Sequence, residues 1–309
     1  MVAQRLLQSL RAPMLIEGHE LVVTPSIGIA LAPDHADSVS ELLKLADTAM
    51  YHAKSAGRNS YAYYSPEMSG SGVGRLKLEA ELRRALERRE LVLYYQPQVK
   101  VATGEIVGAE ALVRWNHPER GLVPPGQFIP LAEETGLIGA VGARVLHQAC
   151  REARRWQDAY GLFVSVNVSG RELVDERFTD MVISRLADCG LPPAHLVLEL
   201  TESTLMADTE AAQATVASLR ELGVALAIDD FGTGYSSLAY LRRMPIGHLK
   251  IDRCFVADLL AGGESEAIVR AVIAMARSLG LRVTAEGVET LEQARALKRL
   301  ACDALQGFH

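Results

Sequence analysis

The hydrophobic positions after residue 90 fall into short apolar runs that alternate with amphipathic segments of helical spacing. The pattern predicts eight strands, at 91–97, 107–114, 163–169, 196–201, 225–230, 248–252, 282–286 and 303–307. The predicted helices between them lie at 141–158, 178–188, 208–222, 236–243, 265–279 and 291–301. Such alternation predicts an α/β fold with parallel strands covered by helices, and eight strands favour a closed barrel over an open doubly wound sheet.

The first 66 residues follow a different pattern, which predicts a helix, a hairpin, a helix and a strand. The run 19–30 alternates like a strand, 39–56 has helical spacing, and 61–64 resembles a short strand. About 65 residues are few for an independent core, so we expect part of a domain. Residues 67–89 are predicted to form a glycine-rich flexible linker followed by a polar helix, because no P-loop sequence is present there.

The composition is that of a globular protein, with 49% hydrophobic and 23% charged residues among 309. No apolar run approaches the roughly 18–20 residues of a membrane helix, so no membrane contact is expected within this chain. The four cysteines form no CxxC pair, which indicates free thiols and a cytoplasmic location, although a longer parent protein could carry an anchor upstream. The net charge of −6 argues against a nucleic acid polymer as partner.

Polar side chains interrupt seven of the predicted strands near their C-terminal ends, where a barrel builds its active site. They are Glu110, Arg114, Asn167, Glu199, Glu202, Asp229, Asp230, Lys250, Asp252, Glu286, Glu289 and Gln306. Any one of these groups could be a salt bridge or a strand cap, but a cluster of buried carboxylates is costly without a cation. Oxygen donors suit Mg²⁺ or Mn²⁺ and disfavour zinc.

Other catalytic chemistry finds little support in the sequence. No histidine stands in an HxH, HxxH or HExxH pattern, and no GxSxG motif is present. These absences favour an activated water over covalent catalysis. The segment DDFGTGYSSL at 229–238 follows a predicted strand, and its two opening acids and two glycines favour a mobile, metal-binding loop over an ordinary turn.

Several motifs resemble those of the EAL domain family, beginning with Glu110-Ala-Leu112 within AEALVRW. The others are YQP at 95–97, FIPLAEETGL at 128–137, NVS at 167–169, ELTE at 199–202, the DDFGTGYSSL loop, LKID at 249–252, AEGVE at 285–289 and QGF at 306–308. The resemblance runs from about 75 to 309 and implies a modified TIM (β/α)8 barrel whose first strand is antiparallel to the rest. The EAL barrel is expected over 90–309, without the last helix of the family barrel because the chain stops at His309.

The resemblance also implies an activity, the hydrolysis of cyclic di-GMP to linear pGpG with two Mg²⁺ or Mn²⁺ ions, and a homodimer formed through the EAL domain. The implied metal ligands are Glu110, Asn167, Glu199, Asp229, Asp230 and Glu286. The implied substrate contacts are Gln96, Leu112, Arg114 and Gln306. Glu110, Asp229, Lys250 and Glu286 are the expected catalytic residues, with the general base left open between Glu286 and a water oriented by Lys250. Glu202, Asp252 and Glu289 are expected to support the loop and the site, and Ca²⁺ is expected to inhibit.

Residues 1–66 resemble the C-terminal fragment of a GGDEF (diguanylate cyclase) domain. The matching segments are 23–30, 46–51, 53–54 and 57–59. The GGDEF signature itself is absent, so no cyclase activity is expected from this chain. Two alternatives to an active phosphodiesterase remain at this point, a non-catalytic cyclic di-GMP receptor and an unrelated Mg²⁺-dependent barrel enzyme.

Overall fold

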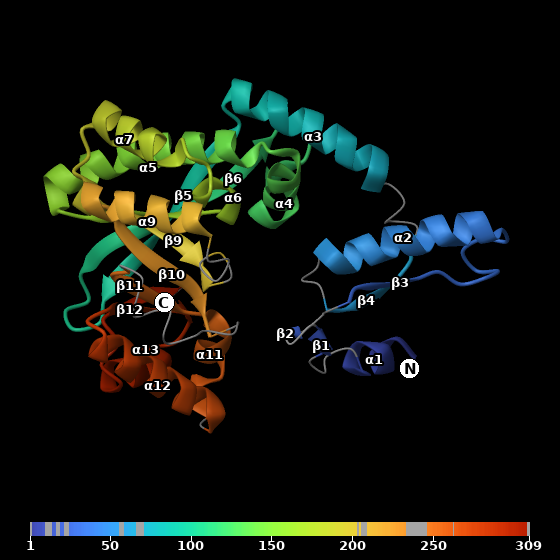
Figure 1. The fold of residues 1–309 in the computed structure, drawn as a ribbon. Helices are drawn as coiled ribbons and strands as arrows, with labels where there is room; N and C mark the ends of the chain where they lie inside the picture. Colours follow the sequence, from blue (N-terminus) through green and yellow to red (C-terminus); the bar gives the residue numbers. More distant parts are fainter. Residues whose placement is uncertain are drawn as a thin grey trace. The chain divides into compact units, whose positions relative to one another are not determined.

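A computed structural model describes residues 2–9, 14–16, 19–21, 25–55, 59–65, 71–202, 204, 209–232, 246–261 and 263–307. The chain divides into two compact units, Met1–Leu82 and Arg83–His309 (Figure 1). Among the described residues, no helix is both long enough and apolar enough to cross a membrane.

The N-terminal unit contains the predicted helix, hairpin, helix and strand. Helix α1 (Val2–Ser9) is followed by the antiparallel pair β1 (Met14–Ile16) and β2 (His19–Leu21), and β3 (Ile27–Ile29) pairs in parallel with β4 (Tyr61–Tyr63). Helix α2 (Val39–Ser55) packs closely on β3, because a Cβ atom on Gly28 would lie 1.9 Å from the backbone oxygen of Ala46. The single strand predicted over 19–30 is interrupted at Pro25, which has no N–H to donate.

Helix α3 (Ser71–Arg88) begins four residues before the predicted start at 75. Its first turn therefore includes part of the glycine-rich run that was expected to form a flexible linker. Residues 66–70 of that segment lie outside the described residues.

Eight strands of the second unit close into a barrel, as predicted. They are β5 (Leu91–Lys100), β6 (Ile106–His117), β8 (Phe163–Val168), β9 (Leu196–Thr201), β10 (Ala225–Phe231), β11 (His248–Ile251), β12 (Arg282–Val288) and β13 (Ala304–Gly307). The barrel closes because β5 pairs with both β6 and β13, and it is antiparallel to both. The remaining neighbours in the barrel pair in parallel. The modified barrel with an antiparallel first strand is thus confirmed.

Helices cover the outside of the barrel (Figure 1). They are α4 (Pro125–Thr135), α5 (Ile138–Tyr160), α6 (Gly170–Leu173), α7 (Phe178–Cys189), α9 (Glu210–Leu222), α11 (Arg253–Ala257), α12 (Glu264–Ser278) and α13 (Leu291–Arg299), with 3₁₀ turns η2 (Pro193–His195) and η3 (Leu259–Ala261). The helix predicted at 236–243 lies outside the described residues. A short strand, β7 (Gly121–Val123), pairs in the antiparallel direction with the end of β6. It was not predicted, because three residues are too few to show a strand period.

Candidate active site

The strand register brings the predicted polar side chains together inside the barrel. Gln96 on β5 pairs with Glu110 on β6, and Asn167 on β8 pairs with Glu199 on β9. Paired residues on neighbouring strands point to the same face of a sheet, and here that face is the barrel interior. The residues between them are apolar and face the helices, as the buried Val166 and Val168 of β8 do. The carboxylates and amides therefore meet inside the barrel, because along each strand they alternate with apolar side chains that point outward.

Lys250 on β11 lies at the centre of the cluster, with a side chain that is 2% exposed. Its Nζ atom lies 2.6 Å from Glu199 Oε2 and 2.6 Å from Glu286 Oε1. It also lies 3.0 Å from Glu110 Oε2 and 3.2 Å from Asp229 Oδ1. One ammonium group thus contacts carboxylates from four different strands.

Both carboxylate oxygens of Glu110 are held by hydrogen bonds. Oε1 accepts from Asn167 Nδ2 at 2.6 Å, and Oε2 accepts from Gln306 Nε2 at 2.6 Å as well as from Lys250. Burial alone would raise the pKa of Glu110, but the charge of Lys250 and these hydrogen bonds lower it below its ordinary value. Lys250 and the two amides therefore favour the ionised form of Glu110.

Two other acids of the cluster, Glu199 and Glu286, keep their protons to higher pH than usual. Burial raises the pKa of Glu199 to about 8 and that of Glu286 to about 7, with neighbouring carboxylates adding to the rise and Lys250 opposing it. Burial would lower the pKa of Lys250, but the four carboxylates raise it well above its ordinary value. Four carboxyl groups therefore share one ammonium, and a divalent cation at this site would relieve the repulsion between them.

Two overlapping groups of acids have the geometry of cation sites. Glu110, Glu199 and Asp229 form one, and Asp229, Asp230 and Glu286 form the other. In each group one carboxylate oxygen from every residue lies within 4.8 Å of those of the others. All of the donors are oxygens, so the residues fit Mg²⁺ or Mn²⁺, and Asp229 belongs to both groups.

Two consecutive acids join this cluster because the end of β10 is irregular. Side chains of neighbouring strand residues normally point to opposite faces. The pairing of β10 with β11 shifts register between Ile228 and Phe231, and Asp230 has a φ of 54°, in the left-handed region. A local irregularity of this kind re-aims a side chain. The backbone N–H of Asp230 also donates to Asp229 Oδ1 at 3.0 Å, which fixes the turn.

The residues expected to support the site divide into two groups. Glu202 Oε2 accepts a hydrogen bond from the backbone N–H of Gly232 at 3.2 Å, so it holds the start of the DDFGTGYSSL loop. Asp252 caps α11 by accepting from the Cys254 N–H at 2.8 Å. Glu289, by contrast, is exposed at the start of α13, outside the cluster. Loop residues 233–238 lie outside the described residues.

Two of the expected substrate contacts line a cavity of about 390 Å³ beside the cluster. Leu112 and Arg114 of β6 lie in its wall with Asn167, and helices α4 and α5 supply most of the rest. Arg114 turns back on the chain, and its Nη1 atom donates to the oxygen of Val113 at 2.8 Å. The other two expected contacts, Gln96 and Gln306, are hydrogen-bonded to each other at 3.0 Å.

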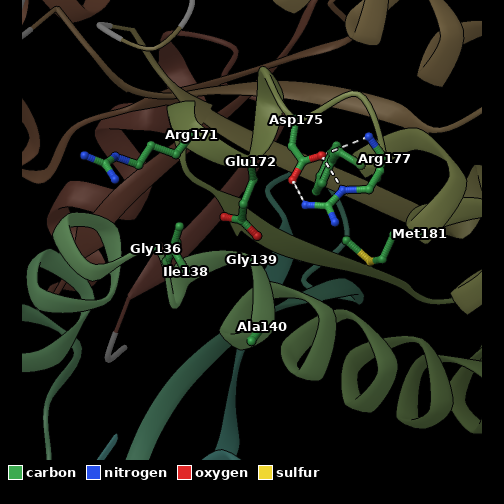
Figure 2. Close-up of a pocket in the computed structure, with 10 residues that line it drawn as sticks. Gly136, Ile138, Gly139, Ala140, Arg171, Glu172, Asp175, Arg177 and Met181 are labelled. Atoms are coloured by element: carbon green, nitrogen blue, oxygen red, sulfur yellow. Dashed lines mark hydrogen bonds and ion pairs between the residues drawn. The ribbon is translucent and has the colours of Figure 1, made fainter. Parts of the chain in front are cut away.

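A second cavity, of about 450 Å³, contains none of the predicted site residues (Figure 2). Arg177 and Asp175 pair with each other at its edge, as the dashed lines in Figure 2 show. The buried Glu172 lies in the wall of both cavities and forms a capping box with Ser169 at the start of α6. Glu172 was not predicted as a site residue, although the pattern Ser-x-x-Glu at 169–172 is the usual signal for this cap.

Comparison with known proteins identifies two families along the chain. The EAL domain matches residues 79–309, and the diguanylate cyclase GGDEF domain matches residues 1–60. The chain is 46% identical over 309 residues to the bifunctional diguanylate cyclase/cyclic di-GMP phosphodiesterase MucR of Pseudomonas aeruginosa, covering 99% of this chain and 45% of that protein. It is 43% identical over 309 residues to the cyclic di-GMP phosphodiesterase NbdA of the same organism, covering 99% of this chain and 40% of NbdA. The chain thus spans less than half the length of these relatives.

Solved structures give the same result. The PaMucR phosphodiesterase in complex with c-di-GMP is 49% identical to this chain and superposes with a TM-score of 0.72. The match covers 75% of this chain and 95% of that one. The EAL enzyme Bd1971, with cAMP and cyclic di-GMP bound, is 34% identical and superposes with a TM-score of 0.73. That match covers 89% of this chain and 73% of the other. The EAL match extends over more than half of the chain. This protein therefore belongs to the EAL domain family and carries a fragment of a GGDEF domain at its N-terminus.

Proposed function

We propose that this chain is a metal-dependent phosphodiesterase that hydrolyses cyclic di-GMP to linear pGpG. The observation that carries the proposal is the convergence of four strand-borne carboxylates on Lys250, which leaves an excess of negative charge for divalent cations. The names of MucR and NbdA support the choice of substrate. The proposal concerns this chain, which is a shorter span than either relative.

The residues that would hold two Mg²⁺ or Mn²⁺ ions are Glu110, Asn167, Glu199, Asp229, Asp230 and Glu286. When bound, two such ions lower the pKa of a water between them and neutralise the phosphate in an in-line displacement. Asp229 belongs to both acidic groups, so its carboxylate would help to hold an ion at either one. Glu110 is held by Asn167, Gln306 and Lys250, so its carboxylate is already oriented.

The two candidates for the general base have different protonation states. The raised pKa of Lys250 keeps its side chain as an ammonium at neutral pH, so it orients the attacking water by donating a hydrogen bond. Glu286, whose Oε1 lies 2.6 Å from that ammonium, is the group that we assign to accept the proton. The water oxygen then bonds to phosphorus, the bond to the 3′ oxygen breaks, and that oxygen takes up a proton.

The adjoining cavity is the place that we assign to the substrate. Leu112 offers it an apolar contact, and Arg114 needs only to release the Val113 oxygen to pair with a phosphate. Gln96 and Gln306 lie on the side of the cluster formed by β5 and β13. The homodimer that the family resemblance implies, and the lack of cyclase activity, remain predictions.

The experiment is to incubate the purified chain with cyclic di-GMP and Mg²⁺ or Mn²⁺ and to follow the products by ion-exchange chromatography. We expect pGpG, and we expect none in the presence of EDTA. Tight cyclic di-GMP binding without turnover, unchanged by Glu110→Ala, would instead identify a receptor. Turnover of another phosphodiester with no binding of cyclic di-GMP would indicate a different enzyme.

Replacing Mg²⁺ by Ca²⁺ is expected to inhibit the reaction. Ca²⁺ takes six to eight ligands at roughly 2.3–2.6 Å, whereas Mg²⁺ requires a tighter octahedron at roughly 2.0–2.1 Å, so the geometry for the attacking water is lost. The measurement is the initial rate at fixed Mg²⁺ with increasing Ca²⁺. An initial rate that stays constant as Ca²⁺ increases would contradict the proposed mechanism.

A further inference from the structure

Three glutamines form a directional chain of hydrogen bonds beside the acidic cluster. Gln98 Nε2 donates to Gln306 Oε1 at 3.0 Å and to Ser165 Oγ at 3.4 Å. Gln306 Nε2 donates in turn to Gln96 Oε1 at 3.0 Å and to Glu110 Oε2 at 2.6 Å. Gln98 is therefore linked to the Glu110 carboxylate through one residue, Gln306, and it was not predicted as a site residue.

The direction of this chain follows from the chemistry of its two ends. An ionised carboxylate only accepts hydrogen bonds, so Gln306 must present its NH₂ group to Glu110. Its carbonyl oxygen then faces Gln98, which must donate. If the amide of Gln306 were reversed, its oxygen would face the carboxylate oxygen at hydrogen-bond distance, and two acceptors would repel each other. By donating to Gln306 Oε1, Gln98 favours the amide orientation in which Gln306 Nε2 donates to Glu110.

Water is excluded from this position. Gln98 is 3% exposed, Gln306 is 4% exposed and Ser165 is fully buried. Gln98 and Gln306 are direct partners in the pairing of β5 with β13. The partner of Gln98 on β6 is Gly108, which contributes no side chain there. A donor lost from Gln98 would leave the buried oxygen of Gln306 without its partner, which is costly.

We propose that Gln98 is a positioning residue that acts through Gln306. It holds the Gln306 amide in the orientation that donates to Glu110, and so fixes the carboxylate that receives a divalent cation. The inference rests on the proposed function for the role of Glu110 as a ligand of that cation. Ser165 assists by accepting the second hydrogen of the Gln98 amide.

The test is a double-mutant cycle with Gln98→Met, which keeps the length of the side chain and removes the donor. The first readout is the side-chain amide signal of Gln306 in a ¹⁵N NMR spectrum, assigned by its loss in Gln306→Met. The second is the affinity for Mn²⁺ alone, measured by calorimetry. We expect Gln98→Met to shift the Gln306 amide signal and to weaken Mn²⁺ binding roughly tenfold, as for other residues that orient a metal ligand.

In the Gln306→Met background, Gln98→Met is expected to have no further effect on Mn²⁺ affinity. Gln148→Met is the matched control, because Gln148 donates a single hydrogen bond to the Leu91 oxygen on the outside of the barrel. If Gln98→Met does not fold, as its melting curve will reveal, Ser165→Ala provides the same cycle with a smaller effect. The melting temperatures of the variants distinguish a loss of folded protein from a change in the orientation of the Gln306 amide.

An unchanged Gln306 signal and unchanged Mn²⁺ affinity in Gln98→Met would overturn the inference. Multiplicative effects in the double variant would also overturn it, because Gln98 would then act independently of Gln306. Neither readout requires hydrolysis. If the wild-type chain yields no pGpG but the variants show the expected non-additive effects on Mn²⁺ affinity, the proposed function is refuted and this inference stands.

Discussion

Glu110→Gln is expected to lower kcat for cyclic di-GMP hydrolysis by roughly a hundredfold or more, since a charged metal ligand supplies several kcal/mol of transition-state stabilisation. The change keeps the size of the side chain and removes the charge that faces Lys250 at 3.0 Å. It also replaces one of the two acceptor oxygens by an NH₂ group, so the side chain can no longer accept from both Asn167 and Gln306. The measurement is steady-state kinetics over a range of Mg²⁺ concentrations.

The matched control for this variant is Glu105→Gln, because Glu105 is exposed just before β6, at the far end of the strand from the site. Its kcat should stay within about twofold of the wild-type value, as expected for a surface change away from the site. A Glu110→Gln variant that keeps wild-type kcat at saturating Mg²⁺ would exclude Glu110 from the catalytic machinery.

Lys250→Met is expected to destabilise the metal-free protein by about 3–5 kcal/mol, the usual cost of removing one partner from a buried ion pair. The variant leaves four carboxylates, from Glu110, Glu199, Asp229 and Glu286, without their common cation. The free energy of unfolding in urea, measured with EDTA present, reports the change. Added Mg²⁺ should recover part of the loss, because the ions supply positive charge to the same oxygens.

Lys100→Met serves as the control, since Lys100 is exposed at the end of β5. Equal unfolding free energies for Lys250→Met and Lys100→Met in EDTA would show that the cluster does not depend on the ammonium. A variant that is stabilised by Mg²⁺ but lacks turnover would agree with a role for Lys250 in orienting the attacking water.

Much of the barrel was predictable because its strands are buried and its helices are amphipathic. The strand predicted at 163–169 is observed at Phe163–Val168, and that at 196–201 at Leu196–Thr201. Elements of three or four residues, such as β7 and α6, were missed because a period cannot be recognised over so short a span. The antiparallel direction of β5 came from the family resemblance and not from the pattern.

The acidic residues of the site were predictable as a set, because each interrupts an apolar strand near its end. The sequence does not reveal that Lys250 contacts four of these acids at once, since that depends on the closure of the barrel. That Asp229 and Asp230 join the same cluster came from the family resemblance and not from the strand pattern, since it depends on the positive φ of Asp230. Gln98 lies two residues after Gln96 and points to the same face of β5, but it was missed because it stands outside the YQP motif at 95–97.

The most direct test of the two-metal site is the anomalous scattering of crystals soaked with Mn²⁺. We expect two peaks inside the barrel, separated by roughly 3.5–4 Å, as in other two-metal sites. Asp229 should lie between them, with Glu110 and Glu199 on one ion and Asp230 and Glu286 on the other. A single peak, or none among these carboxylates at saturating Mn²⁺, would contradict the account.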